Sequence, residues 1–278
     1  MLTTNPFAEL SASVPSGIMQ TFVIVMIVLV VGGTLFDVIH KQSARYFSEL
    51  SRKSAEEGER QVSSSERTSI AMKTLTVDVL TSAEFCNPHR RIAHLLGMYG
   101  FIIYVLASAI LVFGFTGEGA SGGGFWAFLW HLGALMICVG GYWFWFFIRV
   151  DVASEGAAWH KLMRADLFIL SLLGMATFGL LWSIFQSSGA LGWLFFGVFL
   201  IATVVLFGGV PWSKFAHMFF KPAAAYQKRM AYASGEAMGL PTISRDEPEQ
   251  RERHSMELLK DAPMDMGLGI KREAPHHY

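Results

Sequence analysis

Five separate stretches of this chain are each long and apolar enough to cross a lipid bilayer as a helix. A helical crossing of the ~30 Å hydrocarbon layer needs about 20 predominantly apolar residues. Five windows meet this requirement: 17–39, 92–115, 125–148, 166–185 and 189–212. With 53% hydrophobic and only 16% charged residues, the composition also lies outside the soluble class. The sequence therefore predicts an all-α membrane protein with five transmembrane helices.

The basic residues indicate how these helices are oriented. Of the 22 Lys and Arg residues, nine lie between positions 40 and 91, three between 149 and 164, and ten from 214 onward. None lies in the first 39 residues or in the two remaining connections, 116–124 and 186–190. Because Lys and Arg concentrate on the cytoplasmic side, we expect the N-terminus outside and the C-terminus in the cytoplasm. Residues 1–16 lack a basic region, so they are expected to form a short external N-terminus ahead of an uncleaved first helix.

Two cytoplasmic segments follow from this topology. In residues 40–91, helical spacing of Tyr46, Phe47 and Leu50 among mixed charges predicts an amphipathic helix near the lipid headgroups. Residues 213–278 form the cytoplasmic tail, and its later part combines repeated Pro with scattered charge and few large hydrophobic residues. Such a segment buries too little surface to fold alone. It is either solvated chain or, as we favour, an arm that docks a partner.

Two histidines are expected at a similar depth near the cytoplasmic surface. His94 lies at the start of the second helix, and His217 follows the fifth, in the stretch VPWSKFAHMFFKP. Two neutral imidazoles facing each other across a helical bundle can provide both axial ligands of a b-type haem iron. The other interpretation is that they are two unrelated interfacial histidines.

Three nearby cations are candidates for binding the propionates of such a haem. Arg90 and Arg91 precede His94 on the same helix, and Lys214 lies three residues before His217. Cationic side chains form charge-assisted hydrogen bonds with carboxylates. These residues are therefore the expected propionate partners.

Three other polar residues are candidates for a quinone site. His131 lies in the outer half of the third helix, and Asp37 and His40 lie at the inner end of the first. An ionisable residue inside a membrane span is a functional candidate by default. His131 could bind a quinone carbonyl or hydrogen-bond to a neighbouring helix. Asp37 could carry protons to a quinone or pair with a basic residue, and His40 could simply lie at the surface.

The five-helix outline and the stretch after the fifth helix resemble a known family. This family comprises the cytochrome b subunit of respiratory nitrate reductase and the related membrane anchors of sulfur-metabolism complexes. The resemblance implies that His94 and His217 ligate the inner haem. Where the family has a second histidine pair, this chain has Tyr104 and Phe199, so the resemblance implies at most one haem.

A closer resemblance rests on three stretches: GTLFDVIHK, CNPHRRIAHLLGMYGF and GLGIKREAPHHY. They are similar to membrane anchors associated with adenylylsulfate reductase. This implies a cytoplasmic flavin and iron–sulfur enzyme as partner, with electrons passing to or from the quinone pool. Two cysteines, Cys86 and Cys138, are too few for this chain to build an iron–sulfur cluster alone.

Two other function classes stay open at this stage. A haem-free anchor would have the same spans with purely structural histidines. A small transporter would normally carry several charges or broken helices within its spans. The zero net charge gives no sign of a nucleic-acid partner, because the basic residues lie where topology and lipid headgroups place them.

Overall fold

The computed structural model describes residues 2–40, 42–83, 85, 87–117, 122–151, 156–213, 215 and 217–235, and every regular element within them is helical. Five of these helices are long and apolar enough to cross a membrane, which confirms the predicted class. They comprise α2 (Ser16–His40), α5 (Pro88–Gly114), α6 (Gly124–Trp143, continued by η2, Phe144–Ile148), α7 (Leu167–Phe185, preceded by η3, Arg164–Asp166) and α8 (Ala190–Gly208). The observed ends lie within a few residues of the predicted ones.

Glycines allow α5 and α6 to pack with their backbones in close contact. A Cβ atom at Gly100 would lie 2.8 Å from the carbonyl oxygen of Gly133, and one at Gly133 would lie 2.8 Å from that of Gly100. At Gly140, the added atom would lie 2.6 Å from the carbonyl oxygen of Ala93. Small residues at a helix crossing are a common means of association inside a membrane. These three positions therefore tolerate no side chain without separating the helices.

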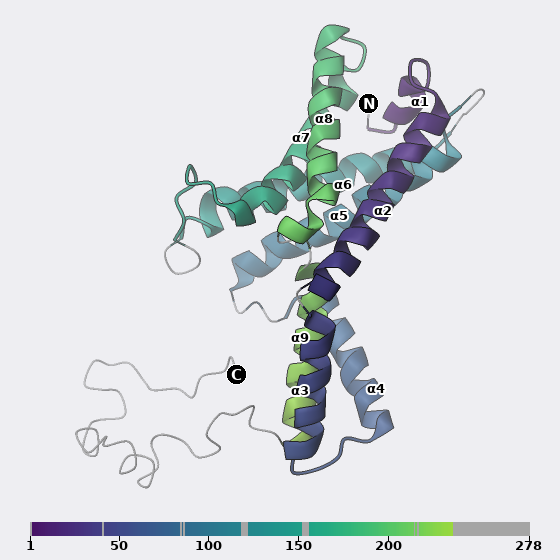
Figure 1. Cartoon of the computed structure of the whole chain (residues 1–278). Coiled ribbons are helices and arrows are strands. Elements are labelled where there is room, and N and C mark those ends of the chain that lie inside the picture. Colours follow the sequence, from purple (N-terminus) through teal and green to yellow (C-terminus); the bar gives the residue numbers. More distant parts are fainter. Residues whose placement is uncertain are drawn as a thin grey trace.

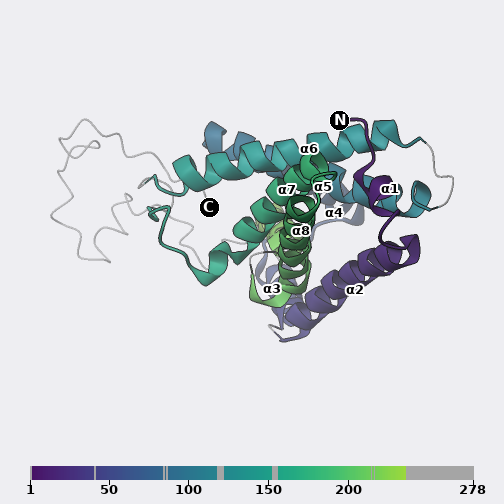
Figure 2. The same cartoon turned by 90° about the horizontal axis from the view of Figure 1, so that it is seen from above.

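A short helix, α1 (Pro6–Leu10), covers one end of the bundle and was not predicted. Asn5 caps it by accepting a hydrogen bond from the amide of Phe7 at 3.0 Å. The ring of Phe7 packs edge-on against Trp130 of α6 and Trp182 of α7, at 5.8 and 5.5 Å between centroids. Figure 2 shows α1 between the start of α2 and the α5–α6 pair. The N-terminal segment is thus packed against the bundle core.

The first span, α2, is the least buried of the five. It contacts α8, α5 and η4 (Val210–Trp212), the short turn after α8. A Cβ atom at Gly33 would lie 3.0 Å from Cβ of Val210, so the two segments touch there. In Figures 1 and 2, α2 runs along one side of the other four spans. Much of the apolar surface of α2 is therefore not covered by the other spans.

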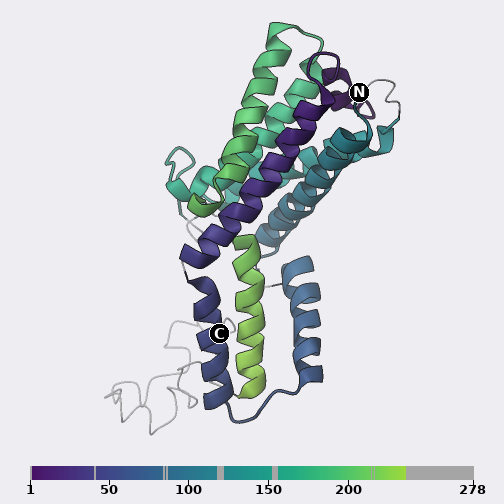
Figure 3. The ribbon, with the colours of Figure 1, turned by 45° about the vertical axis from the view of Figure 1, so that its right-hand side comes forward.

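Three further helices form an extension at one end of the spans (Figures 1 and 3). They are α3 (Ser43–Glu57), α4 (Ser64–Lys73, continued by η1, Thr74–Leu80) and α9 (His217–Ser234), and both others pack against α9. The predicted amphipathic helix is present as α3, but it lies along α9 and extends away from the spans. Helix α9 was not predicted; it occupies the first part of the predicted tail, whose residues 236–278 lie outside the described part.

An ion pair joins two parts of this extension. The guanidinium of Arg229 on α9 donates to both carboxylate oxygens of Asp78 in η1, at 2.6 and 2.8 Å. This hydrogen bonding raises the pKa of Arg229 above its ordinary value, despite partial desolvation. A bidentate, partly buried pair is more specific than an exposed one. It fixes the position of α9 relative to the helix that precedes α5.

A buried arginine organises the loop between α6 and α7. Arg149 is fully buried and pairs with Asp166, with 2.6 Å between Nη2 and Oδ2. Its guanidinium also donates to the carbonyl oxygens of Ala157, Ala158 and Lys161 and lies 4.3 Å from the ring centroid of Trp145. With the second bond to Asp166, at 3.3 Å, every donor of the guanidinium has an acceptor.

Candidate functional site

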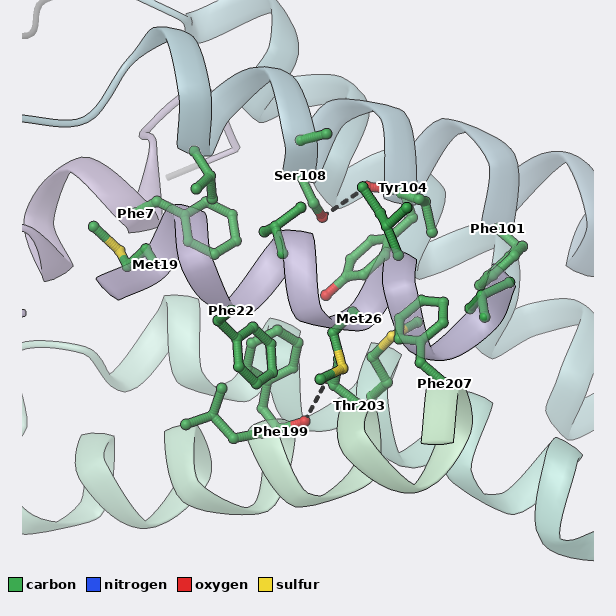
Figure 4. A pocket seen from close by; sticks show the side chains of 18 of the residues that line it. Phe7, Met19, Phe22, Met26, Phe101, Tyr104, Ser108, Phe199, Thr203 and Phe207 are labelled. Carbon is green, nitrogen blue, oxygen red and sulfur yellow. Dashed lines mark hydrogen bonds between the residues drawn. The ribbon is translucent and has the colours of Figure 1, made fainter. Parts of the chain in front are cut away.

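A cavity of about 540 Å3 lies between α2 and the other spans. It extends from Phe7 and Leu10 of α1 to Phe215 and to Met218 in the first turn of α9. This volume is in the usual range for small-molecule sites, about 300–1,000 Å3. Figure 4 shows its aromatic and Met-rich walls, which include side chains from α2, α5 and α8.

Only three side chains in the cavity lining carry a hydroxyl: Tyr104, Ser108 and Thr203. Ser108 donates to the carbonyl oxygen of Tyr104 at 2.8 Å and accepts from Nε1 of Trp130 at 3.0 Å. Thr203 donates to the carbonyl oxygen of Phe199 at 2.7 Å. The hydroxyl of Tyr104 is buried and has no hydrogen-bond partner among the described residues.

The surroundings of Tyr104 hold its side chain firmly. The residue is 2% exposed, and its ring is stacked on Trp130 with 5.0 Å between centroids. A Cβ atom at Gly179 of α7 would lie 2.8 Å from the tyrosine oxygen, so a glycine is required there. In Figure 4 the hydroxyl points towards the side of the cavity where Met26 and Phe199 lie. A fixed and buried donor therefore lies in the wall of the cavity, beside Gly179.

His94 lies in the second turn of α5, as predicted. Asn87 caps this helix by accepting from the amides of His89 and Arg90, with Pro88 at the first helical position. The Nδ1 atom of His94 lies 3.1 Å from the hydroxyl of Ser82, and its ring is 4.9 Å from that of Phe85. A haem-ligating histidine typically has one ring nitrogen held by such a hydrogen bond.

His217 is the first residue of α9 and packs edge-on against Phe168 of α7, at 5.5 Å between centroids. Phe168 also contacts Phe215, which in turn contacts Phe101 of α5. His217 thus lies beside the start of α7, and Phe215 connects this region with the middle of α5. Neither imidazole lines the 540 Å3 cavity. The Ser82 contact fits an axial ligand, and the haem remains a prediction.

Two of the propionate candidates lie beside His94. The guanidinium of Arg90 lies 5.6 Å from the ring centroid of Phe85, the residue that also contacts His94. Nε of Arg91 donates to the carbonyl oxygen of Thr81 at 2.7 Å. Lys214 lies outside the described residues, as does Cys86.

His131 is a buried histidine with both ring nitrogens hydrogen-bonded. Nδ1 lies 2.7 Å from the carbonyl oxygen of Ala127, and Nε2 lies 2.8 Å from the hydroxyl of Ser183 on α7. Since a carbonyl can only accept, Nδ1 carries the proton, and in the neutral ring Nε2 accepts from Ser183. This geometry matches the structural interpretation of His131. Binding a quinone here would require one of these bonds to break.

The other two quinone candidates lie at the C-terminal end of α2. Asp37 is 1% exposed, one turn after the contact between Gly33 and Val210. His40, the last residue of the helix, is exposed and stacks on Phe36 at 5.4 Å. The structure brings neither residue to the cavity lining. Their predicted roles therefore rest on the sequence.

Tyr104 is a candidate site residue that was not predicted from the sequence. In the family pattern, Tyr104 and Phe199 were notable only as positions that lack a histidine. Both residues line the cavity. The available signal was a phenolic hydroxyl in the middle of an apolar span, which must find a partner or remain unsatisfied.

Comparison with protein-family models, with curated proteins and with solved structures found no match. The proposed function therefore rests on the five apolar helices, the three-helix extension and the cavity.

Proposed function

We propose that this chain is a membrane anchor and electron-transfer subunit. It connects a cytoplasmic flavin and iron–sulfur oxidoreductase with the quinone pool. The observation that carries this proposal is the combination of a polar three-helix extension at one end of the spans with a wide apolar cavity among them. The extension offers a surface for a water-soluble enzyme, and the cavity offers room for a lipid-soluble electron carrier. Substrate chemistry on sulfur belongs to the partner.

The extension lies in the cytoplasm in this proposal, and the loop after α5 lies outside. The support is the distribution of Lys and Arg, which are absent from residues 1–39, 116–124 and 186–190. Reporter fusions after Gly122 and Ser188 are expected to report an external location, and fusions after Arg60 an internal one. An internal signal after Gly122 would contradict the orientation.

The partner proposed here is adenylylsulfate reductase, on the basis of the sequence resemblance. The docking surface comprises the extension and residues 236–278. The ion pair between Asp78 and Arg229 stabilises the extension, so it can present a defined surface to the enzyme. The lipids of a bacterial inner membrane surround the spans.

One b haem on the cytoplasmic side belongs to this proposal. Bound between His94 and His217, a haem would supply a one-electron relay between the partner and the quinone. Ser82 orients the imidazole of His94 through its Nδ1 atom. Arg90 and Arg91 lie near enough on α5 to bind carboxylates, with Lys214 as a third candidate.

Two alternatives predict different observations. A haem-free anchor would give no haem absorption after purification under haem-sufficient conditions. A transporter would need polar or charged groups along a path through the spans, and the cavity lining is apolar apart from three hydroxyls. The experiment that tests the proposed function is isolation of the complex followed by a measurement of electron transfer to quinone.

A further inference from the structure

We propose that the cavity between α2 and the other spans is the quinone site, and that the hydroxyl of Tyr104 donates a hydrogen bond to a quinone carbonyl. The inference deepens the proposed function and rests on it for the identity of the ligand. In this proposal Tyr104 of α5 binds the ligand, and all the contacts described above are kept.

Within the described part of the chain, the hydroxyl of Tyr104 is an unsatisfied hydrogen-bond donor in the wall of the cavity. A buried hydroxyl without a partner is costly, so native proteins nearly always provide one. Ser108 and Thr203 have backbone acceptors, whereas Tyr104 has none among the described residues. The ring of Tyr104 is held by stacking on Trp130 and by contact with Gly179, so its hydroxyl cannot move to another acceptor. A molecule in the cavity that carries a hydrogen-bond acceptor can supply the missing partner once the side chains that cover the buried hydroxyl move aside.

Tyr104 lies far from both ends of its helix. Tyr104 lies ten residues from the end of α5 and sixteen from its start, which corresponds to about 15 Å and about 24 Å along the axis. The hydroxyl therefore lies deep within a hydrocarbon layer of about 30 Å. Phospholipid ester carbonyls lie at the interfaces. The acyl chain of a lipid in its normal position could therefore fill the cavity, but the ester carbonyl could not reach the hydroxyl of Tyr104. The acceptor must belong to a molecule whose polar group can enter the hydrocarbon region.

The shape of the cavity and its access from the bilayer also restrict the ligand. Phe22 of α2 and Phe199 and Phe207 of α8 provide flat apolar walls near Tyr104 (Figure 4). Because α2 is the least buried span, an apolar molecule can reach the cavity from the bilayer beside it. A planar ring with carbonyl groups and a long apolar chain satisfies all three requirements. Quinones of the respiratory membrane have this chemistry.

Binding to the purified full-length chain tests this inference without any partner enzyme. The probes are labelled decylubiquinone and decylbenzene, which share a six-membered ring and a decyl chain; decylbenzene lacks the carbonyl oxygens and also the methoxy and methyl groups, so the Tyr104→Phe comparison isolates the hydrogen bond. Binding is measured with the chain in nanodiscs and corrected for empty nanodiscs. Wild-type protein is expected to bind decylubiquinone more tightly than decylbenzene. Loss of one hydrogen bond in Tyr104→Phe should weaken decylubiquinone binding about three- to tenfold and leave decylbenzene binding unchanged.

Two further variants control the interpretation. Tyr142→Phe makes the same change on the exposed side of α6, where the hydroxyl contacts Thr177, and should not alter the binding of either probe. Ala109→Phe fills part of the cavity but keeps the Tyr104 hydroxyl, and should weaken both probes. Melting temperature and gel filtration establish that each variant is folded. If Tyr104→Phe fails to fold, the Ala109→Phe variant tests the proposal instead. Unchanged binding of decylubiquinone to that variant would overturn the proposal.

The remaining outcomes are also decisive. Equal affinity of wild-type protein for the two probes, or unchanged affinity in Tyr104→Phe, would show that the cavity is a groove for acyl chains. Absence of binding would overturn the site as well. If the site fails while the isolated complex still transfers electrons to quinone, the proposed function survives with a different site. If the site holds but no partner passes electrons to quinone, the proposed function fails and the site stands.

Discussion

Replacing Arg149 with leucine is expected to lower the free energy of unfolding by about 3 kcal/mol or more, the typical cost of removing one partner from a buried ion pair. The change leaves the Asp166 carboxylate buried without its cation and removes the donors to three loop carbonyl groups. Thermal unfolding of the detergent-purified protein measures the effect. The same change at Arg164, an exposed residue of the same connection, should have little effect.

A double replacement distinguishes the ion pair from simple loss of packing. If the cost arises from the unpaired carboxylate, replacing both Arg149 and Asp166 with leucine should restore part of the lost stability, because no buried charge remains. A double variant as unstable as the sum of the two single ones would contradict this explanation.

Replacing either His94 or His217 with alanine is expected to abolish the low-spin haem spectrum or convert it to a high-spin one. A six-coordinate b haem needs both imidazoles, and neither alone can hold that state. The measurement is a dithionite-reduced minus oxidised spectrum of protein produced under haem-sufficient conditions. His160→Ala, at an exposed position, is the matched control and should leave the spectrum unchanged.

Wild-type protein without a Soret band would end the ligand assignment for both histidines. A normal low-spin spectrum in either alanine variant would remove that residue from the ligand set. The anchor function would survive both results, with the quinone taking electrons directly from the last cluster of the partner.

The five spans could be predicted because length and continuous apolar composition alone determine them. Helix α9 could not, because its sequence is polar overall, contains Pro222 and continues into a segment typical of disordered chain. Its stability comes from packing against α3 and η1, and such contacts are not visible in local composition. The same holds for α1, whose five residues are too few for an independent helix but bury Phe7 against two tryptophans.

Site residues were predictable only in part. His131 and Asp37 were recognised as buried ionisable residues, yet the partner of His131, Ser183, lies on another helix and could not be inferred from spacing. In the sequence, Arg149 is only one of the basic residues that indicate membrane orientation. Its pairing with Asp166 depends on how the loop folds and could not be predicted. The importance of Tyr104 emerges only when its neighbours are known, since most buried tyrosines find a partner.

The central claim is that this chain passes electrons between a cytoplasmic enzyme and quinone. The most direct measurement is to purify it in mild detergent from the membranes of the cells that produce it. The proteins that accompany it are identified, and quinone reduction or quinol oxidation is assayed with the partner's own substrate. We expect a flavin and iron–sulfur enzyme whose quinone-dependent turnover is lost when this chain is removed. Removal of residues 236–278 should release the enzyme while the five spans still insert. A chain that purifies without such an enzyme, or an enzyme whose reaction with quinone does not require the chain, would contradict the claim.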